Sequence, residues 1–230
     1  MKRLIGLLFA AGLALGAAAA VATWFSERRR HNIFPSSQAQ MLLNPLRQRL
    51  MPVARTLERF GIGPGQTVLE LGPGPGYYSL EASSLVGPTG RLLCLDLQRG
   101  MLNILSSRLS EAGASADLIV ADATRVPLAS SSIDRAFLVT VLGEVPDQDA
   151  ALAELRRVLK PGGLLGFAES LGDPDIVFLG KLRSICRRHG FEEVSRHGSP
   201  LAYTAVFRAP ENRPREKSRA GLPTGGEPTR

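Results

Sequence analysis

Cysteine and histidine are scarce in this chain of 230 residues, which contains two cysteines and three histidines. The two lone thiols, Cys94 and Cys186, exclude a disulfide framework and a four-cysteine zinc site, and we expect both to be core residues. We expect His189 at a helix end and His197 in a loop, solvated or capping rather than catalytic. The sequence therefore offers no metal site and no covalent nucleophile. Its 44% apolar and 21% charged residues are typical of a globular protein.

A basic body is also missing, although the chain carries a formal charge of +7. Residues 1–31 have a net charge of +4, residues 208–230 a net charge of +3, and residues 32–207 a net charge of zero. Nucleic-acid-binding proteins concentrate positive charge on the surface that contacts phosphate. The zero net charge of residues 32–207 argues against a nucleic-acid partner. The positive charge at the two ends of the chain is instead informative about where in the cell the protein lies.

One long uncharged run is present, at residues 4–25. At about 1.5 Å per residue, a helix of that length crosses the roughly 30 Å hydrocarbon core of a bilayer. Trp24 and Phe25 would then lie at headgroup level, directly before the arginines at residues 28–30. The alternative is a cleaved signal peptide with a basic start at residues 2–3. The length of the run and the arginines after it favour an uncleaved anchor with a basic flank, residues 1–31.

The basic residues around this run also predict its orientation. Two precede it and three follow, so the positive-inside tendency predicts a single-pass membrane protein whose body faces the cytoplasm. Gly12 and Gly16 form a step that can pack two such helices, although the abundance of alanine and glycine makes chance the simpler interpretation. Residues 208–230 are basic and rich in proline and glycine, and we expect a disordered tail there.

Apolar runs alternate with helical patterns in residues 63–207, which we expect to form the main domain. The five runs lie at residues 67–71, 91–96, 117–121, 133–142 and 163–169. The clearest helix covers residues 147–159, with Asp147 as a plausible N-cap and the Lys-Pro-Gly-Gly sequence at 160–163 as its stop. Buried strands separated by helices predict a parallel sheet. Two last runs, 191–196 and 203–207, leave no room for a helix between them and predict an antiparallel hairpin.

Residues 32–62 precede the first strand and carry a helical stripe of leucines. The stripe is interrupted at Pro45 and Pro52, which suit the first turn of a helix, so we expect two short helices. A face packed on the core explains the stripe most simply. A lid over a ligand is the alternative.

The residues suited to binding follow the ends of the first three runs, where ligands bind in open parallel sheets. Gly72, Gly74 and Gly76 form a turn that a ligand can approach without Cβ clashes. Asp96 ends the second run and can accept both hydroxyls of a ribose. The pair at residues 122–123, Asp-Ala, follows the third run, where an acid can accept from an adenine amino group. A ligand that contains ribose and adenine accounts for all three positions.

Two nucleotide-binding classes do not fit these residues. The dinucleotide fingerprint G-x-G-x-x-G requires a glycine where this chain has Tyr77. A short-chain reductase needs a Tyr-x-x-x-Lys pair, which does not occur in the sequence. The glycine loop alone is weak evidence for any one ligand, and its combination with the spaced acids is stronger.

Five ordered motifs resemble the class I S-adenosylmethionine-dependent methyltransferases, particularly the type 11 branch that includes ubiquinone/menaquinone-biosynthesis C-methyltransferases. They are residues 68–76 (VLELGPGPG), 95–96 (LD), 121–123 (ADA), 132–134 (SID) and 155–163 (LRRVLKPGG). The resemblance implies an α/β fold with a Rossmann-like, doubly wound, mostly parallel seven-stranded sheet and a C-terminal antiparallel hairpin. It also implies S-adenosyl-L-methionine as the cofactor and a transferase activity of class EC 2.1.1.-.

The same resemblance implies roles for individual positions. Glu70 would support the glycine loop and the methionine amino group, and Gly72, Gly74 and Gly76 would pass under the cofactor. Asp96 would hold the ribose, and Asp122 and Ala123 would flank the adenine. Each acid also has a simpler interpretation, since a lone carboxylate is commonly a surface charge and Asp122 can cap the next turn.

Residues for the chemistry itself are less defined. Glu144 and Glu169 lie at the ends of the fourth and fifth runs, and each is either a general base or a rim charge. Candidate walls for a small, lipophilic acceptor are Phe34, Met41, Leu42 and Tyr203. Methyl transfer is an in-line displacement that needs alignment above all. The alternatives are a catalytically silent protein that binds the cofactor, or a methyltransferase acting on protein or RNA.

Overall fold

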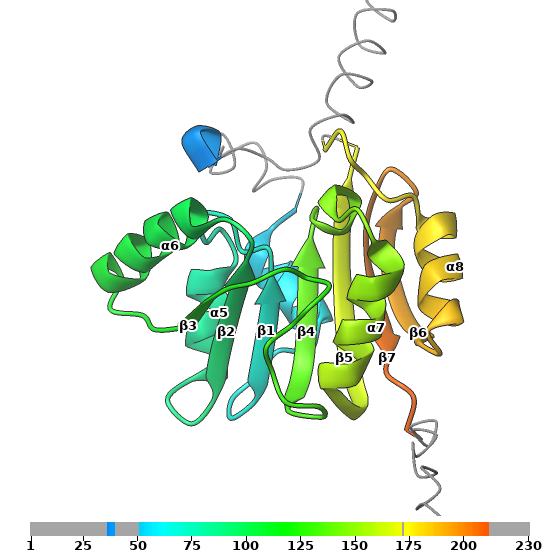
Figure 1. Cartoon of the computed structure of the whole chain (residues 1–230), viewed down its shortest axis with the longest axis horizontal. Helices are drawn as coiled ribbons and strands as arrows, with labels where there is room; N and C mark the ends of the chain where they lie inside the picture. The colour runs from blue at the N-terminus through cyan, green and yellow to red at the C-terminus, as the bar shows by residue number, and fades with distance from the viewer. Residues whose placement is uncertain (1–35, 40–50, 172, 212–230) are drawn as a thin grey trace, which may run out of the picture.

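The computed structural model describes residues 36–39, 51–171 and 173–211, which contain a seven-stranded sheet of order β3-β2-β1-β4-β5-β7-β6 (Figure 1). The first five strands pair in parallel, and β7 lies antiparallel between β5 and β6. The strand bounds are β1 Thr67–Leu71, β2 Arg91–Asp96, β3 Asp117–Val120, β4 Ile133–Val139, β5 Leu159–Ser170, β6 Glu192–Ser199 and β7 Ala202–Arg208. The predicted seven-stranded α/β sheet with its antiparallel hairpin is confirmed.

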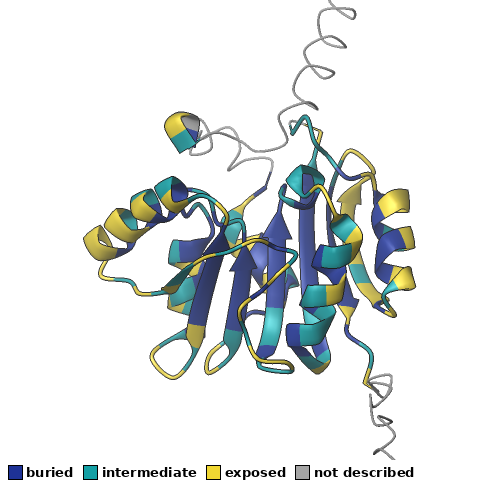
Figure 2. Ribbon diagram, in the orientation of Figure 1, coloured by how far each residue is buried: buried dark blue, intermediate teal, exposed yellow. Residues whose placement is uncertain are grey.

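Helices cover both faces of this sheet and make three layers. The bounds are η1 Ser36–Gln38, α4 Val53–Arg59, α5 Ser79–Val86, α6 Arg99–Glu111, η2 Leu142–Glu144, α7 Gln148–Val158 and α8 Leu179–Arg188. Apolar side chains of α4, α5 and α6 form one core, and those of α7 and α8 form the other. Within β1, Val68 joins the first core while Leu69 and Leu71 join the second. Because both faces are covered, the central strands are buried along most of their length, as Figure 2 shows.

The helix before β5 begins where its sequence predicts. The Asp147 side chain accepts a hydrogen bond from the Ala150 N–H at 2.9 Å and so caps α7. The helix ends at Val158, but β5 starts at once with Leu159 rather than at the expected residue 163. The Lys-Pro-Gly-Gly stretch stops the helix and also continues as strand, with an irregular register between Ile133 and Arg135 on the neighbouring β4.

Other boundaries also differ from the sequence expectation. β6 continues to Ser199 instead of ending at residue 196, so His197 lies in a strand and not in the expected loop. β4 ends at Val139, three residues before the predicted end, because Thr140 adopts a left-handed φ of 53° and the chain then turns into η2. The last strand continues to Arg208, and Ala209 is buried and hydrogen-bonded to Gly163. The ordered domain thus extends two residues past the predicted boundary at 207.

Several expectations concern residues that the structure does not describe. The membrane anchor and its flank at residues 1–31, most of the tail at 208–230, and the wall candidates Phe34, Met41 and Leu42 lie outside the described residues. Of the two short helices expected in residues 32–62, α4 is described and begins directly after Pro52, whereas residues 40–50 are not described. Within the described ranges, no helix has the length and hydropathy needed to cross a bilayer.

Candidate functional site

The parallel strands end along one side of the sheet, which we call the carboxyl edge. It is formed by the ends of β1 to β5, at Leu71, Asp96, Val120, Val139 and Ser170. Strand order reverses between β1 and β4, since β2 and β3 lie on one side of β1 and β4 to β7 on the other. In doubly wound sheets, the crevice at such a switch point is where ligands bind. All of the predicted binding residues lie at this edge.

The glycine loop after β1 is closely packed from both sides. Gly72 has a φ of 69°, and a Cβ there would lie 2.5 Å from the Val141 Cγ2 that follows β4. Gly76 has a φ of 85°, and a Cβ there would lie 2.4 Å from Leu105 Cδ1 of α6. Both positions need the left-handed conformation and the missing side chain. The loop is therefore fixed by its neighbours, with a bare backbone at the edge.

Asp96 joins this loop to the end of β2. Its Oδ2 accepts from the Gly74 N–H at 3.3 Å, and its Oδ1 accepts from the Gln98 N–H at 2.8 Å. Burial raises the pKa of the carboxyl, while these two backbone donors act in the opposite direction. The loop and the acid, predicted separately from the sequence, are thus in direct contact.

Glu70 lies beneath the loop on the side of α5 and α6. Its Oε2 accepts from the Ser79 hydroxyl at 2.6 Å and from the Cys94 thiol at 3.7 Å. Burial raises the pKa of Glu70 to about 7, and it also raises the pKa of the Cys94 thiol. Ser79 is the first residue of α5, so the pair connects β1 to the helix that follows the loop. Sequence reasoning missed Ser79, since one serine at a helix start carries no distinctive signal.

Asp122 and Ala123 follow β3 at the same edge. The Ala121 N–H donates to the Asp96 carbonyl at 3.1 Å, which brings the end of β3 next to that of β2. Asp122 is exposed, and its Oδ1 accepts from the N–H and the hydroxyl of Thr124 at 2.8 and 2.9 Å. These two hydrogen bonds hold the pKa of Asp122 below its usual value. This is the turn-capping arrangement that the sequence left open as an alternative.

The end of β5 carries a second buried carboxyl, on the opposite face of the sheet. Glu169 is 2% exposed, and its Oε2 accepts from the Val177 N–H at 3.2 Å. The Tyr203 hydroxyl donates to the carbonyl of the same Val177. The backbone N–H and the carbonyl of Val177 are therefore both hydrogen-bonded. We call the group of Glu169, Val177 and Tyr203 the Val177 clasp. It fixes the connection from β5 to α8.

Burial raises the pKa of Glu169 to about 8, and the negative charges of Asp173 and Glu144 act in the same direction. Burial also raises the pKa of the Tyr203 hydroxyl above its usual value. Tyr203, expected as a pocket wall, is buried beneath the connection with its hydroxyl committed to Val177. Glu144 is half-buried in η2, directly after β4.

Thr140 is a strained residue between β4 and η2. Its φ of 53° lies in the left-handed region, which a β-branched side chain rarely adopts. Such a conformation costs on the order of 1–3 kcal/mol and clusters at functional sites. The Thr140 N–H donates to the Ala168 carbonyl at 2.9 Å, which holds the turn in place. No sequence signal could have indicated it, because threonine is an ordinary strand residue.

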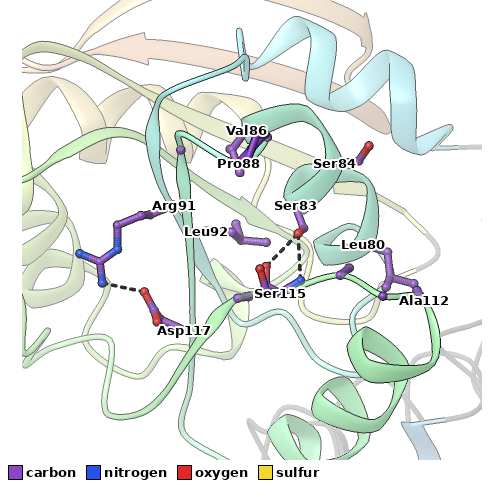
Figure 3. Close-up of a pocket in the computed structure, with 15 residues that line it drawn as sticks. Leu80, Ser83, Ser84, Val86, Pro88, Arg91, Leu92, Ala112, Ser115 and Asp117 are labelled. Carbon is purple, nitrogen blue, oxygen red and sulfur yellow. Dashed lines mark hydrogen bonds and ion pairs between the residues drawn. The ribbon is translucent and has the colours of Figure 1, made fainter.

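A cavity of about 580 Å³ lies at the edge of the sheet opposite the carboxyl edge, where β2 and β3 begin. It is enclosed by the end of α5, the start of β2 and the connection from α6 to β3 (Figure 3). Its lining includes the Ser83 hydroxyl, which accepts from the Ser115 N–H and donates to its carbonyl, and the ion pair of Arg91 with Asp117 (Figure 3). None of the predicted binding residues lines this cavity. The carboxyl edge is therefore the better candidate site.

Comparisons with known proteins bear on the family of this domain. Residues 68–163 match the family model described as "Methyltransferase domain". The chain is 35% identical over 112 residues to the ubiquinone/menaquinone biosynthesis C-methyltransferase UbiE of Saccharophagus degradans, covering 48% of this chain and 45% of that protein. The same enzyme of Bordetella avium is 36% identical over 112 residues, with 49% and 44% covered. The chain thus spans less than half the length of these relatives.

Solved structures agree on the fold. A SAM-dependent methyltransferase from Aquifex aeolicus superposes with a TM-score of 0.72 at 22% identity, covering 77% of this chain and 100% of that chain. The [4+2]-cyclase SpnF superposes with a TM-score of 0.62 at 19% identity, covering 70% and 80%. Identities this low speak for the fold alone, and a protein named as a cyclase among the neighbours shows that the fold does not fix the reaction.

Proposed function

We propose a function for this chain from the premise that residues 68–163 are a class I S-adenosyl-L-methionine-dependent methyltransferase domain. The chain transfers a methyl group to a small, lipophilic acceptor by in-line displacement. The observation that carries this proposal is the direct contact between the glycine loop and Asp96 at the switch point of the sheet. A bare backbone and a buried carboxylate side by side are what a nucleoside ligand requires.

The residues at the ends of β1, β2 and β3 fit the cofactor. The Asp96 carboxylate uses one acceptor position on each oxygen for backbone N–H groups. A carboxylate has about four such positions, so two remain for the ribose hydroxyls. Gly72 and Gly74 leave room for the methionine portion, Glu70 supports them through Ser79, and Asp122 and Ala123 flank the adenine.

S-adenosyl-L-methionine, when bound, supplies an electrophilic methyl group on a sulfonium sulfur. The chain contributes orientation, which is worth about 7–11 kcal/mol in favourable intramolecular reactions. The acceptor then lies over the ends of β4 and β5, because the ends of β1 to β3 are taken by the cofactor. Glu144, half-buried beside that position, is the better placed of the two predicted bases to contact the acceptor. Glu169 is buried in the Val177 clasp and acts as a positioning residue.

The names of the relatives suggest the acceptor class. Two of them are C-methyltransferases of ubiquinone/menaquinone biosynthesis, so we propose a quinone-type aromatic acceptor methylated on carbon. Such acceptors carry apolar tails and reside in membranes. An anchor at residues 4–25 fits that source and gives a single-pass protein with its domain in the cytoplasm, where the cofactor is made.

A transfer assay tests the activity. We expect full-length protein, incubated with methyl-tritiated S-adenosyl-L-methionine and a membrane lipid extract, to move label into the lipid fraction. Asp96→Ala is the matched variant and should leave that fraction unlabelled. Binding without transfer would identify a silent cofactor-binding protein, and label in protein or RNA would identify another acceptor. A wild-type protein that binds no cofactor in calorimetry contradicts the proposal.

A reporter assay tests the location separately. A cytosol-dependent reporter fused after Arg230 should be active, because the proposed orientation places the C-terminus inside the cell. A reporter that is active only after export would exclude this topology.

A further inference from the structure

Exposed apolar side chains gather at the carboxyl edge. The described residues include six large apolar side chains with high exposure: Leu97, Val120, Leu171, Phe178, Val194 and Leu201. Leu97 and Val120 stand at the ends of β2 and β3, and Leu171 directly follows β5. Leu201 precedes the first residue of β7, which pairs with the last residue of β5. Only Val194, within β6, lies away from this edge.

Three of these residues lie on the connections that follow β5 and precede α8 and β7, and we call them the apolar rim: Leu171, Phe178 and Leu201. They are 47%, 51% and 50% exposed. The Leu171 N–H donates to the Leu201 carbonyl at 2.7 Å, so the two connections lie side by side. Phe178 follows Val177, whose N–H and carbonyl are both held by the clasp. The rim is thus presented on a braced backbone, next to the ends of β4 and β5.

The start of the described chain is held at the same edge. The Ser36 N–H donates to Gln98 Oε1 at 3.2 Å, and the Gln98 N–H is itself bound by Asp96. A Cβ on Gly100 at the start of α6 would lie 2.8 Å from the Ser36 hydroxyl. Ten residues, 26–35, separate Ser36 from the uncharged run at 4–25. At about 3.3–3.6 Å per residue, these ten residues span about 36 Å at most, so the tether to the uncharged run is short and starts at the carboxyl edge.

We infer that the carboxyl edge faces the bilayer, with the apolar rim in contact with the boundary between headgroups and acyl chains. This inference rests on the proposed membrane anchoring and adds the orientation of the domain and the source of its acceptor. A lipophilic acceptor then passes from the membrane into the site without crossing water. Asp173 and Asp175 lie between Leu171 and Phe178 in the chain, and their negative charges would be repelled by anionic lipids. The contact with the bilayer therefore depends on burial of the apolar side chains and needs no anionic lipid.

Fluorescence quenching by lipids tests this orientation. We would label Phe178→Cys and Leu201→Cys in full-length protein reconstituted into phosphatidylcholine vesicles that contain a brominated phospholipid. Thr89→Cys, exposed at the opposite edge between α5 and β2, is the matched control. Cys94 and Cys186 are buried and should remain unlabelled. We expect at least twofold stronger quenching at residues 178 and 201 than at residue 89.

The other outcomes overturn the inference in distinguishable ways. Equal quenching at all three positions would show that the edge does not face lipid. Strong self-quenching between labels at 178, independent of the brominated lipid, would show that a second copy covers the rim. Protein that does not float with the vesicles would remove the anchoring on which the inference rests. Methyl transfer measured on the same samples separates these failures from a failure of the proposed activity, and cofactor binding reports that the variants are folded.

Discussion

The two halves of the carboxyl edge are built differently. Where β1 and β2 end, Glu70 and Asp96 hold a glycine loop through a hydroxyl and backbone N–H groups, on the side of α5 and α6. Where β5 ends, Glu169 and Tyr203 hold the backbone of one residue, Val177, through its N–H and its carbonyl, on the side of α7 and α8. The first half leaves backbone and carboxylate open to a ligand. In the second half, the buried carboxyl of Glu169 instead stabilises the connection from β5 to α8. A fixed connection of this kind can serve as a wall of an acceptor pocket.

The largest expected effect tests the first half. We expect Asp96→Ala to weaken S-adenosyl-L-methionine binding by about 100-fold or more, because hydrogen bonds to a charged group are worth about 1.5–3 kcal/mol each and two ribose hydroxyls are involved. Isothermal calorimetry measures this. Asp117→Ala, an exposed acid paired with Arg91, is the control and should bind normally. A loss below tenfold for Asp96→Ala would mean that the ribose lies elsewhere.

The glycine loop gives a second test. Gly72→Ala combines a left-handed φ with a clash against Val141, and should lower the free energy of unfolding by about 2–5 kcal/mol. Gly113→Ala has a similar φ of 62° but no atom within 4 Å of the added Cβ, and should lose only about 1–2 kcal/mol. Urea denaturation measures both values. Equal losses would show that the contact with Val141 is not tight.

A pH series compares the two buried carboxyls. Glu169 has a pKa raised from 4.5 to about 8, so the folded protein binds more protons than the unfolded chain between these values. Its contribution to stability is greatest below pH 4.5 and is lost as the pH rises to about 8. We therefore expect Glu169→Gln to gain about 1–3 kcal/mol relative to wild type at pH 8.5 and little at pH 4.5.

Glu70→Gln serves as the counterpart, because the pKa of Glu70 is raised only to about 7. Its relative gain should be complete by about pH 7, one unit before that of Glu169→Gln. Thermal unfolding followed by circular dichroism across this range distinguishes the two profiles. Identical profiles would mean that the hydrogen bond from Ser79 does not lower the pKa of Glu70 relative to that of Glu169.

The smallest effect concerns the two buried tyrosines that donate to carbonyls. Tyr203→Phe removes the hydrogen bond to Val177, and Tyr78→Phe removes the one to Met51. Each should lower the free energy of unfolding by about 1–2 kcal/mol, since a buried carbonyl loses its donor. Hydrogen exchange of the Val177 amide should accelerate in Tyr203→Phe and stay unchanged in Tyr78→Phe. Exchange that is unchanged in both would show that the clasp does not brace the connection.

The sequence predicted the first half well because its residues form contiguous motifs. The glycine turn directly follows β1, and Asp96 ends the next strand, so strand periodicity and a parallel sheet suffice to place them together. The second half was predicted only as two acids at strand ends. Glu169 binds the N–H of Val177, just before α8, and Tyr203 of β7 binds the carbonyl of the same residue. Nothing in the spacing of the three residues indicates that they meet there.

By itself, the sequence determined the α/β class, a parallel core with an antiparallel hairpin, and which glycines and acids follow the strand ends, because periodicity and turn residues are local. Only the tertiary structure decided that Ser79 supports Glu70, that Thr140 is held in a strained conformation, and that Asp122 caps its own turn. It also decided that Leu171, Phe178 and Leu201 gather at one edge. These features arise when segments far apart in the chain are packed together, and the desolvation and close contacts that result exist only in the folded protein.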